Sequence, residues 1–284
     1  MIKYTIRRFF FYCFCQFVFF KYKILKQKLP DRSQCFKLFF KYIKIFKRSF
    51  YYYSGKHKIY YSPVHSGTGW RKYLHGFFEE DESFIYTQYI KTNHTVVDIG
   101  ANIGHHTIAF SNIAREGLVI AFEPSKYSYE YLSKNVKSIK NVLPINIALS
   151  NQNSMVKFYE CEDDVFSGLK DTLRNEVIEE HFTLCMKGDD ILSNLKLNNI
   201  DFIKIDVEGF EQEVLEGIAQ TIKTYKPIIL CEIYGGTNSN KSPLKTTHFL
   251  ISLGYTAYVI ENKKLKAFIQ HNDDHYNYVF LPAT

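Results

Sequence analysis

In two short segments of this sequence, an apolar run is closed by an acidic residue and followed by a glycine. This arrangement places the acidic side chain beside a bound ligand. In the first, the β-branched run Thr95–Ile99 contains Asp98 and leads through Gly100 and Gly104 into the helical pattern His106–Ala114. A strand, a tight glycine turn and a helix start bring backbone N–H groups to the positive end of a helix dipole. We expect the two glycines to let a ligand approach the backbone closely.

The spacing of this turn argues against a dinucleotide site. The pyrophosphate fingerprint is G-x-G-x-x-G, whereas Gly100 and Gly104 are four positions apart with Asn102 between them. An acid followed by G-x-x-x-G suits a ligand with a charged amino-acid end, because a carboxylate can help to hold an ammonium group. The form D-x-G-A-N-x-G resembles the first motif of methyltransferases that depend on S-adenosylmethionine (SAM).

A second apolar run, Leu118–Phe122, ends in Glu123 and Pro124 before another helical pattern. An acid that closes this strand can accept both hydroxyl protons of an adenosine ribose. Such an acid also occurs in nicotinamide-cofactor folds, so Glu123 alone indicates only a nucleoside. Together with Asp98 and the glycine turn it predicts SAM. The competing interpretation is an ordinary βαβ unit with a solvent-facing acid.

A third apolar run, Val142–Leu149, extends the cofactor prediction. In open α/β sheets, ligands lie beyond the carboxyl ends of the strands at the topological switch point. Asn146 and Ala148 therefore fall where an adenine ring would lie.

The other chemical centre is the segment Ile200–Gly209. A strand is expected to end at Asp206, and Glu208 lies in the turn that leads into the next helix. This arrangement places two carboxylates at the same edge of the sheet as Asp98 and Glu123. Asp206 and Glu208 are candidates for a general base or for orienting a substrate. In the alternative, Asp206 only contacts the amino-acid end of SAM and Glu208 only caps the helix.

Further side chains near these strand ends could take part in the chemistry. Asp206 and Glu232 could bind Mg²⁺ together with substrate oxygens, but no Asp-Asn pair follows Ile233 and we predict no metal. His105 and His106 adjoin the glycine turn and could act as bases, although a lone histidine is more often structural.

The order of elements predicts the fold that positions these groups. Strands alternate with helices and crossovers, which is typical of an α/β, doubly wound, Rossmann-like sheet. A closing strand pair, Tyr255–Ile260 and Tyr276–Leu281, suggests an antiparallel edge and seven strands in all. The polar stretch Glu160–Glu180 predicts a loop-and-helix insertion that could contact substrate.

Charge divides the chain of 284 residues into two parts. Residues 1–75 hold seventeen Lys or Arg and one acid, whereas residues 76–284 hold nineteen bases and twenty-eight acids. We therefore predict a basic, aromatic-rich helical extension over 1–75, with short strands around Lys58–Ser62, and a catalytic domain over 76–284.

Within the extension, Cys35–Phe50 has phenylalanines on one helical face and lysines mostly on others, which is typical of a helix at a membrane interface. Phe9–Phe20 is too short to span a bilayer comfortably. Two interpretations of residues 1–50 stay open: peripheral contact with a membrane, and a helical cap packed on the domain. Nucleic-acid binding is not expected, because no recognised nucleic-acid-binding motif accompanies the lysine and arginine residues. Cys161, Cys185 and Cys231 lie in strand-like runs and read as reduced, buried thiols of a cytoplasmic protein.

Four segments together resemble the FkbM family of SAM-dependent methyltransferases: Val97–Gly104, Ala121–Pro124, Asn146–Ser150 and Lys204–Gly209. The resemblance spans about residues 76 to 235 and leaves out residues 1–75. It implies SAM as cofactor and methylation of hydroxyls in saccharides, glycolipids or related natural products. His105 and His106 depart from the aromatic residue that the family often has before the threonine.

The expected function is therefore O-methylation of a hydroxyl-bearing saccharide or glycolipid acceptor, in the cytoplasm or at the inner membrane face. Asp98, Gly100, Asn102, Gly104, Glu123, Pro124, Asn146 and Ala148 would bind the cofactor, and Asp206 and Glu208 would be catalytic. The alternatives are a metal-assisted or N-directed methyltransferase, and a non-catalytic scaffold protein of glycan assembly that keeps the SAM fold.

Overall fold

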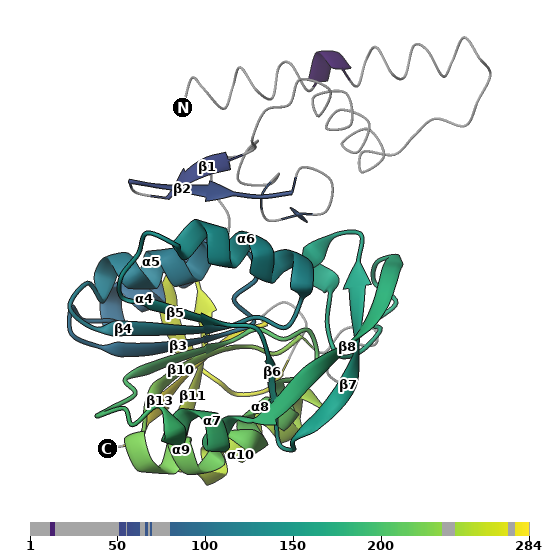
Figure 1. Ribbon diagram of the computed structural model, residues 1–284. Coiled ribbons are helices and arrows are strands. Elements are labelled where there is room, and N and C mark those ends of the chain that lie inside the picture. The colour runs from purple at the N-terminus through teal and green to yellow at the C-terminus, as the bar shows by residue number, and fades with distance from the viewer. Residues whose placement is uncertain are drawn as a thin grey trace.

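A large mixed sheet with helices on both faces forms the centre of the computed structural model (Figure 1). The structure describes residues 12–14, 51–54, 56–62, 66–67, 69, 80–234, 242–271 and 276–283. The predicted helix Cys35–Phe50 and the apolar run Phe9–Phe20, apart from residues 12–14, lie outside these ranges. No helix within them is long and apolar enough to cross a bilayer.

Within the described residues, eight strands make up the sheet, in the order β5-β4-β3-β9-β10-β13-β11-β12. Their bounds are β3 Thr95–Ile99, β4 Leu118–Phe122, β5 Val142–Ile145, β9 Phe202–Ile205, β10 Ile228–Glu232, β11 Tyr255–Glu261, β12 Lys264–Ala267 and β13 Asn277–Pro282. The five strands from β5 to β10 are parallel, and the other three pair antiparallel. The predicted α/β class with an antiparallel edge is confirmed.

The prediction of seven strands was wrong by one, because β12 adds an edge strand. Asn262 and Lys263 both have positive φ, which is the backbone of a tight type I′ hairpin turn that returns the chain beside β11. The strand Lys264–Ala267 is short and half of it is lysine, so it carries no strand signal in the sequence.

Helices cover the sheet in two layers (Figure 1). One face carries α4 Glu80–Tyr89, α5 His105–Ile113 and α6 Lys126–Val136; the other carries α7 Gly188–Asn194, α8 Glu211–Gly217, α9 Ala219–Tyr225 and α10 Pro243–Ser252. Apolar residues of the strands alternate between two buried clusters, one against α4 and α5 and one against the second layer. The near-continuous apolar strands of the sequence follow from this double coverage.

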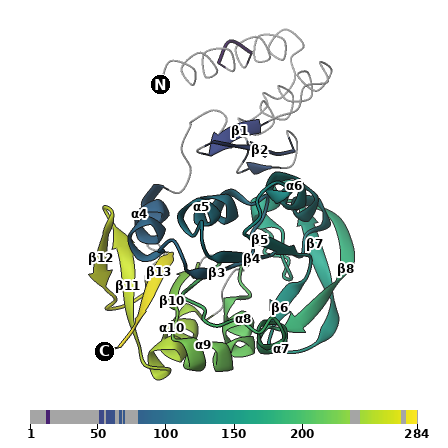
Figure 2. The same cartoon turned by 60° about the vertical axis from the view of Figure 1, so that its left-hand side comes forward.

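A second, three-stranded sheet flanks the β5 edge, as Figure 2 shows from the side. It consists of β6 Ala148–Ser150, β7 Ser154–Cys161 and β8 Val177–Lys187, with the short 3₁₀ turn η1 Asp164–Phe166 in the loop between β7 and β8. The insertion expected over Glu160–Glu180 therefore contains little helix. Its ends belong to the two long strands, whose solvent side is partly apolar.

A hairpin of β1 Tyr51–Ser54 and β2 His57–Tyr60 packs over α5 and α6 (Figures 1 and 2). Tyr52, Ile59 and Tyr61 are buried in one cluster with residues of the glycine turn and of both helices. Asn135 fixes the hairpin, because its side chain accepts a hydrogen bond from the Tyr60 N–H and donates one to the Tyr60 carbonyl. The short strands expected around Lys58–Ser62 are present, and they share a core with the domain.

Candidate active site

A cavity of about 740 Å³ opens at the carboxyl ends of β3, β4, β9 and β10, the edge of the sheet that the sequence predicted. Gly100, Asn102, Glu123, Pro124 and Ala148 line one part of it. Asp206 and Glu208 line another part, together with the loop between β7 and β8. Of the ten predicted site residues, these seven border one common space.

Asp98, Gly104 and Asn146 do not border the cavity. Asp98 is fully buried below the turn, where its Oδ2 accepts a hydrogen bond of 2.6 Å from the Thr107 hydroxyl. Its Oδ1 finds no hydrogen-bond partner among the described residues. Burial raises the pKa of Asp98 above its ordinary value, while nearby Lys204 opposes that rise.

The glycines of the turn are required chiefly by the protein's own packing. Gly100 has φ +81°, and a Cβ there would lie 1.8 Å from the carbonyl oxygen of Asp206. Gly104 has φ +90° and precedes α5, and a Cβ there would lie 2.8 Å from Leu132. Both positions therefore need glycine before any ligand is considered. Gly100 brings the turn directly against the Asp206 backbone and so joins the two predicted centres.

Glu123 is held at the cavity wall by two backbone donors. Its Oε2 accepts from the Asn102 N–H at 2.6 Å, and its Oε1 accepts from the Ser125 N–H at 2.8 Å. Burial raises the pKa of Glu123 to about 8, although these two hydrogen bonds act in the opposite direction.

Asn146 supports the same loop from behind. Its side-chain N–H groups donate to the carbonyl of Glu123 at 2.7 Å and to that of Pro124 at 3.3 Å. Asn146 therefore fixes the backbone after β4. Ala148 and its neighbours Ile147 and Leu149 supply an apolar wall at this end of the cavity.

Two ion pairs hold the carboxylates of the second centre. Asp206 Oδ2 lies 3.0 Å from Nζ of the buried Lys204. Glu208 Oε2 lies 2.6 Å from Nη1 of Arg174, and Glu208 itself has φ +52° in the tight turn before α8. Burial is the largest effect on Glu208 and, with Asp206 beside it, raises its pKa to about 8, while Arg174 lowers it.

Glu232 brings a third carboxylate to this end. Single oxygen atoms of Asp206, Glu208 and Glu232 all lie within 4.8 Å of one another. Three hard oxygen donors at this separation suit a divalent cation such as Mg²⁺. The sequence had paired Asp206 with Glu232 for this chemistry, and the structure adds Glu208.

Several residues of the cavity wall were not singled out from the sequence. Arg174 is stacked between two aromatic rings, with its guanidinium carbon 4.6 Å from the centre of Phe166 and 4.7 Å from that of Tyr234. Glu82 of α4 lies 3.6 Å from His106 at another part of the wall. The polar composition of the β7–β8 loop was the only sequence feature that pointed to Arg174. Nothing in the sequence indicates that Glu82 contacts His106.

His105 and His106 both border the cavity, as their place after the glycine turn suggested. His105 Nδ1 lies 3.0 Å from the Tyr52 hydroxyl, so the β1–β2 hairpin contacts the start of α5. Both imidazoles are almost completely buried.

Comparison with known proteins identifies this arrangement. Residues 98–257, more than half of the chain, match the Methyltransferase FkbM domain. The chain belongs to the FkbM methyltransferase family. The match starts at Asp98 and includes both carboxylate centres, the β7–β8 insertion and the start of β11. The family resemblance carried by the four sequence segments is thereby confirmed.

Relatives of the FkbM chain are distant. The hexuronic acid methyltransferase AglP of Haloferax volcanii is 28% identical over half of this chain and 56% of its own length. The 2-O-methyltransferase NoeI of Sinorhizobium fredii is 23% identical over 46% of this chain and 60% of its own length. The chain thus spans little more than half the length of these relatives. A crystal structure of an FkbM methyltransferase from Methylobacillus flagellatus has a TM-score of 0.49 and 16% identity, covering 74% of this chain and 50% of that one.

Proposed function

We propose that this protein is a SAM-dependent O-methyltransferase that acts on a hydroxyl of a saccharide, a glycolipid or a related natural product. The observation that supports it most is a cavity that is lined both by the glycine turn with Glu123 and by the carboxylates of Asp206 and Glu208. One part has the groups that an adenosine and an amino-acid end need, and the other has groups that can take a proton. Membership of the FkbM family and the names of the two relatives agree with it.

The donor set of the first part fits SAM. Glu123 offers a carboxylate for the ribose hydroxyls, and Ile147 and Ala148 offer apolar surface for an adenine. The buried Oδ1 of Asp98 lacks a partner among the described residues, and from behind the glycine turn it can reach the ammonium group of SAM through water. When bound, SAM supplies an already activated methyl group. The chain must therefore align an acceptor oxygen and accept its proton.

Glu208 is the preferred proton acceptor in this proposal. Its pKa of about 8 places its titration close to physiological pH, where general-base catalysis is efficient. Asp206, held by Lys204, orients the acceptor beside it. The aromatic rings of Phe166, Phe210 and Tyr234 border the same end of the cavity. Flat aromatic faces beside carboxylates suit a sugar ring, which combines apolar C–H faces with hydroxyls.

A metal-assisted reaction is the second candidate, favoured by the group of Asp206, Glu208 and Glu232. A divalent cation there would bind the acceptor oxygen and lower the pKa of its hydroxyl. Turnover after removal of divalent ions with EDTA, and again after adding Mg²⁺, separates the two mechanisms. Full activity in EDTA supports Glu208 as the base, whereas activity that returns only with Mg²⁺ supports the metal route.

Calorimetric titration with SAM tests the cofactor assignment. Wild type should bind SAM saturably and Asp98→Ala should lose most of that binding. Methyl transfer to uronic-acid, neutral-sugar and glycolipid acceptors then tests the activity. A well-folded wild type that binds no SAM would instead support the non-catalytic scaffold protein.

Contact of residues 1–50 with a membrane surface stays a prediction from their composition. Flotation with liposomes that contain anionic lipid should recover the full chain and lose a chain that lacks residues 1–50. Equal flotation of both would contradict it.

A further inference from the structure

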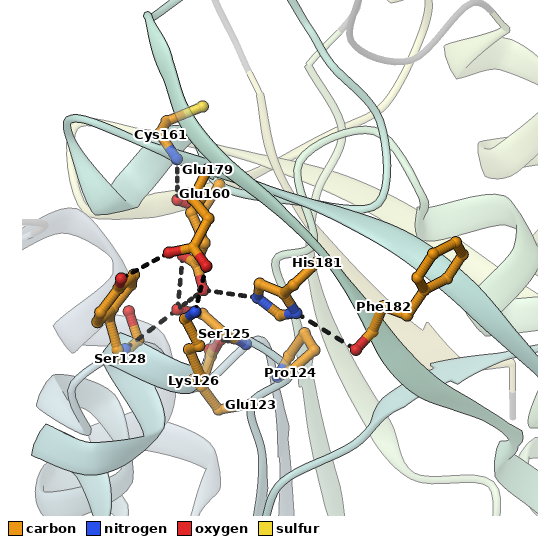
Figure 3. Close-up of polar contacts among 12 residues, drawn as sticks. Glu123, Pro124, Ser125, Lys126, Ser128, Glu160, Cys161, Glu179, His181 and Phe182 are labelled. Atoms are coloured by element: carbon orange, nitrogen blue, oxygen red, sulfur yellow. Dashed lines mark hydrogen bonds and ion pairs between the residues drawn. The ribbon is translucent and has the colours of Figure 1, made fainter.

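A buried polar cluster outside the cavity links the three-stranded sheet to the loop that carries Glu123 (Figure 3). Its centre is Glu160 of β7, whose side chain is 3% exposed. Both carboxylate oxygens of Glu160 lie 2.9 Å from the Ser125 hydroxyl, which donates to them. His181 of β8 approaches from the other side, with Nε2 3.0 Å from Oε1 of Glu160. A buried carboxylate is costly unless it is paired and hydrogen-bonded, and this one is satisfied from two elements.

Serine, acid and histidine in contact do not form a nucleophilic triad here. In such a triad the histidine lies between the serine and the acid, so that it can take the serine proton. In this cluster the carboxylate of Glu160 lies between Ser125 and His181, as the dashed contacts in Figure 3 show. The geometry therefore fixes the position of Ser125 and does not activate its hydroxyl.

Ser125 stands at a junction of three contacts. Its hydroxyl accepts from the Ser128 N–H at 3.1 Å and caps α6. Its own backbone N–H donates to Oε1 of Glu123 at 2.8 Å. The position of Ser125 thus determines where one of the two donors to the Glu123 carboxylate lies. The other donor, the Asn102 N–H, belongs to the glycine turn.

We propose that Glu160, supported by His181, is a positioning residue that acts through Ser125 to orient the Glu123 carboxylate toward the cofactor ribose. The proposal rests on the function proposed above. Through it, the β7–β8 strands take part in cofactor binding although Glu160 does not border the cavity. Loss of the Glu160 contact releases the side chain that anchors Ser125 at the start of α6, so its backbone can shift and its N–H no longer holds a fixed position beside the Glu123 carboxylate.

A second link between the three-stranded sheet and the start of α6 provides a matched control. Glu179 of β8 accepts hydrogen bonds from Lys126 Nζ at 2.5 Å and from the Tyr127 hydroxyl at 2.6 Å, at the exposed start of α6. Glu179 stands opposite Glu160 in the strand register. Its removal cuts a β8–α6 contact without touching Ser125 or Glu123.

The test measures the Kd of S-adenosylhomocysteine by calorimetry for Glu160→Ala, Glu160→Gln and Glu179→Ala. We expect Glu160→Ala to raise the Kd about tenfold, because Glu123 loses an ordered donor. Glu160→Gln should raise it by about threefold or less, since its amide oxygen can still accept from Ser125. Glu179→Ala should leave it unchanged.

A double-mutant cycle with Glu123→Gln decides whether Glu160 acts through Glu123. The double variant should bind no more weakly than Glu123→Gln alone, because the group being positioned is already changed. Additive losses would mean that Glu160 only supports the general packing, and would overturn the proposal. If Glu160→Ala does not fold, Ser125→Ala removes the same contact and replaces it in the cycle.

Failure of this inference is distinct from failure of the proposed function. If wild type binds S-adenosylhomocysteine and Glu123→Gln weakens it, while Glu160→Ala has no effect, only the positioning role is wrong. If wild type binds neither SAM nor S-adenosylhomocysteine, the proposed cofactor itself is wrong.

Discussion

Arg174 and Glu208 meet in the cavity, with Nη1 of the guanidinium 2.6 Å from Oε2 of the carboxylate. The rings of Phe166 and Tyr234 stack on Arg174, so its charge is fixed beside Glu208. The two side chains come from separate segments: Arg174 from the β7–β8 loop and Glu208 from the turn after β9. The insertion therefore supplies a charge that lowers the pKa of the group that we propose as the base.

Replacing Arg174 should move the pH profile of turnover. Burial and Asp206 raise the pKa of Glu208 to about 8, and the charge of Arg174 acts against them. In Arg174→Gln that pKa rises further, so the acid limb of kcat should shift upward by roughly one unit, about a tenfold loss at neutral pH. A Lys157→Gln variant, which removes a charge from an exposed pair on β7, should keep the wild-type profile. An unshifted limb in Arg174→Gln would rule out Glu208 as the titrating base.

Glu123→Gln should stabilise the protein at alkaline pH while it weakens cofactor binding. The pKa of Glu123 is about 8 in the folded chain and near 4.5 when unfolded, so the folded state binds more protons between these values. The free energy of unfolding therefore falls as pH rises from about 4.5 to about 8. Glutamine does not ionise, so the variant escapes this loss of stability. The Tm of Glu123→Gln relative to that of wild type should therefore rise by about 5 °C between pH 5 and pH 8.

The comparison across pH separates this effect from others. Glutamine offers one acceptor oxygen to the Asn102 and Ser125 N–H groups, which lowers the Tm equally at every pH. Glu179→Gln serves as a control, because its hydrogen bonds with Lys126 and Tyr127 lower the pKa of Glu179. Its variant should show no rise in relative Tm with pH. A constant difference for Glu123→Gln would contradict the buried, raised-pKa state of Glu123.

Local sequence pattern predicted the strands, the glycine turn and the edge of the sheet where the acids gather. It succeeded because buried parallel strands are apolar over their whole length and because Asp206 and Glu123 directly follow such strands. The position of a residue along a strand does not reveal how deeply its side chain is buried, however. Asp98 lies one residue before the strand end and is covered by the turn, so it does not reach the cavity as Glu123 does.

Contacts between distant segments could not be derived from the sequence. Arg174 lies 34 positions before Glu208, and Glu160 lies 35 positions after Ser125. Each pair depends on how the β7–β8 strands fold back over the domain, and no periodicity records that. The role of Gly100 was also only partly foreseen: the expected close approach is made by the Asp206 carbonyl of the chain itself.

Gly100→Ala should destabilise the fold and disturb the second carboxylate centre together. The new Cβ would lie 1.8 Å from the Asp206 carbonyl oxygen, in a backbone conformation with positive φ. We expect a loss of about 3 kcal/mol in the free energy of unfolding. Gly254→Ala has a similar φ of +87° but nothing within 4 Å of its Cβ, so it should lose only about 1 kcal/mol. Urea denaturation of both variants measures the difference. Equal losses in the free energy of unfolding would show that the Asp206 carbonyl can move away from the new Cβ without destabilising the fold.

The roles of Asp206 and Glu208 should separate binding from turnover. Asp206→Asn and Glu208→Gln keep the shape of the side chains but remove the charges that face the acceptor end of the cavity. We expect kcat to fall by about 100-fold or more in Glu208→Gln, while the Kd of SAM changes by less than about threefold, because a general base acts in the transition state. Asp206→Asn should raise the KM of the acceptor and also weaken SAM binding modestly, since it leaves the buried Lys204 with less compensating charge.

Glu213→Gln on α8, whose carboxylate pairs with Lys170 at 3.5 Å, is the matched control and should retain wild-type kinetics. Wild-type turnover in Glu208→Gln would assign the proton to another acceptor, and equal losses of SAM binding and kcat would place Glu208 among the cofactor contacts.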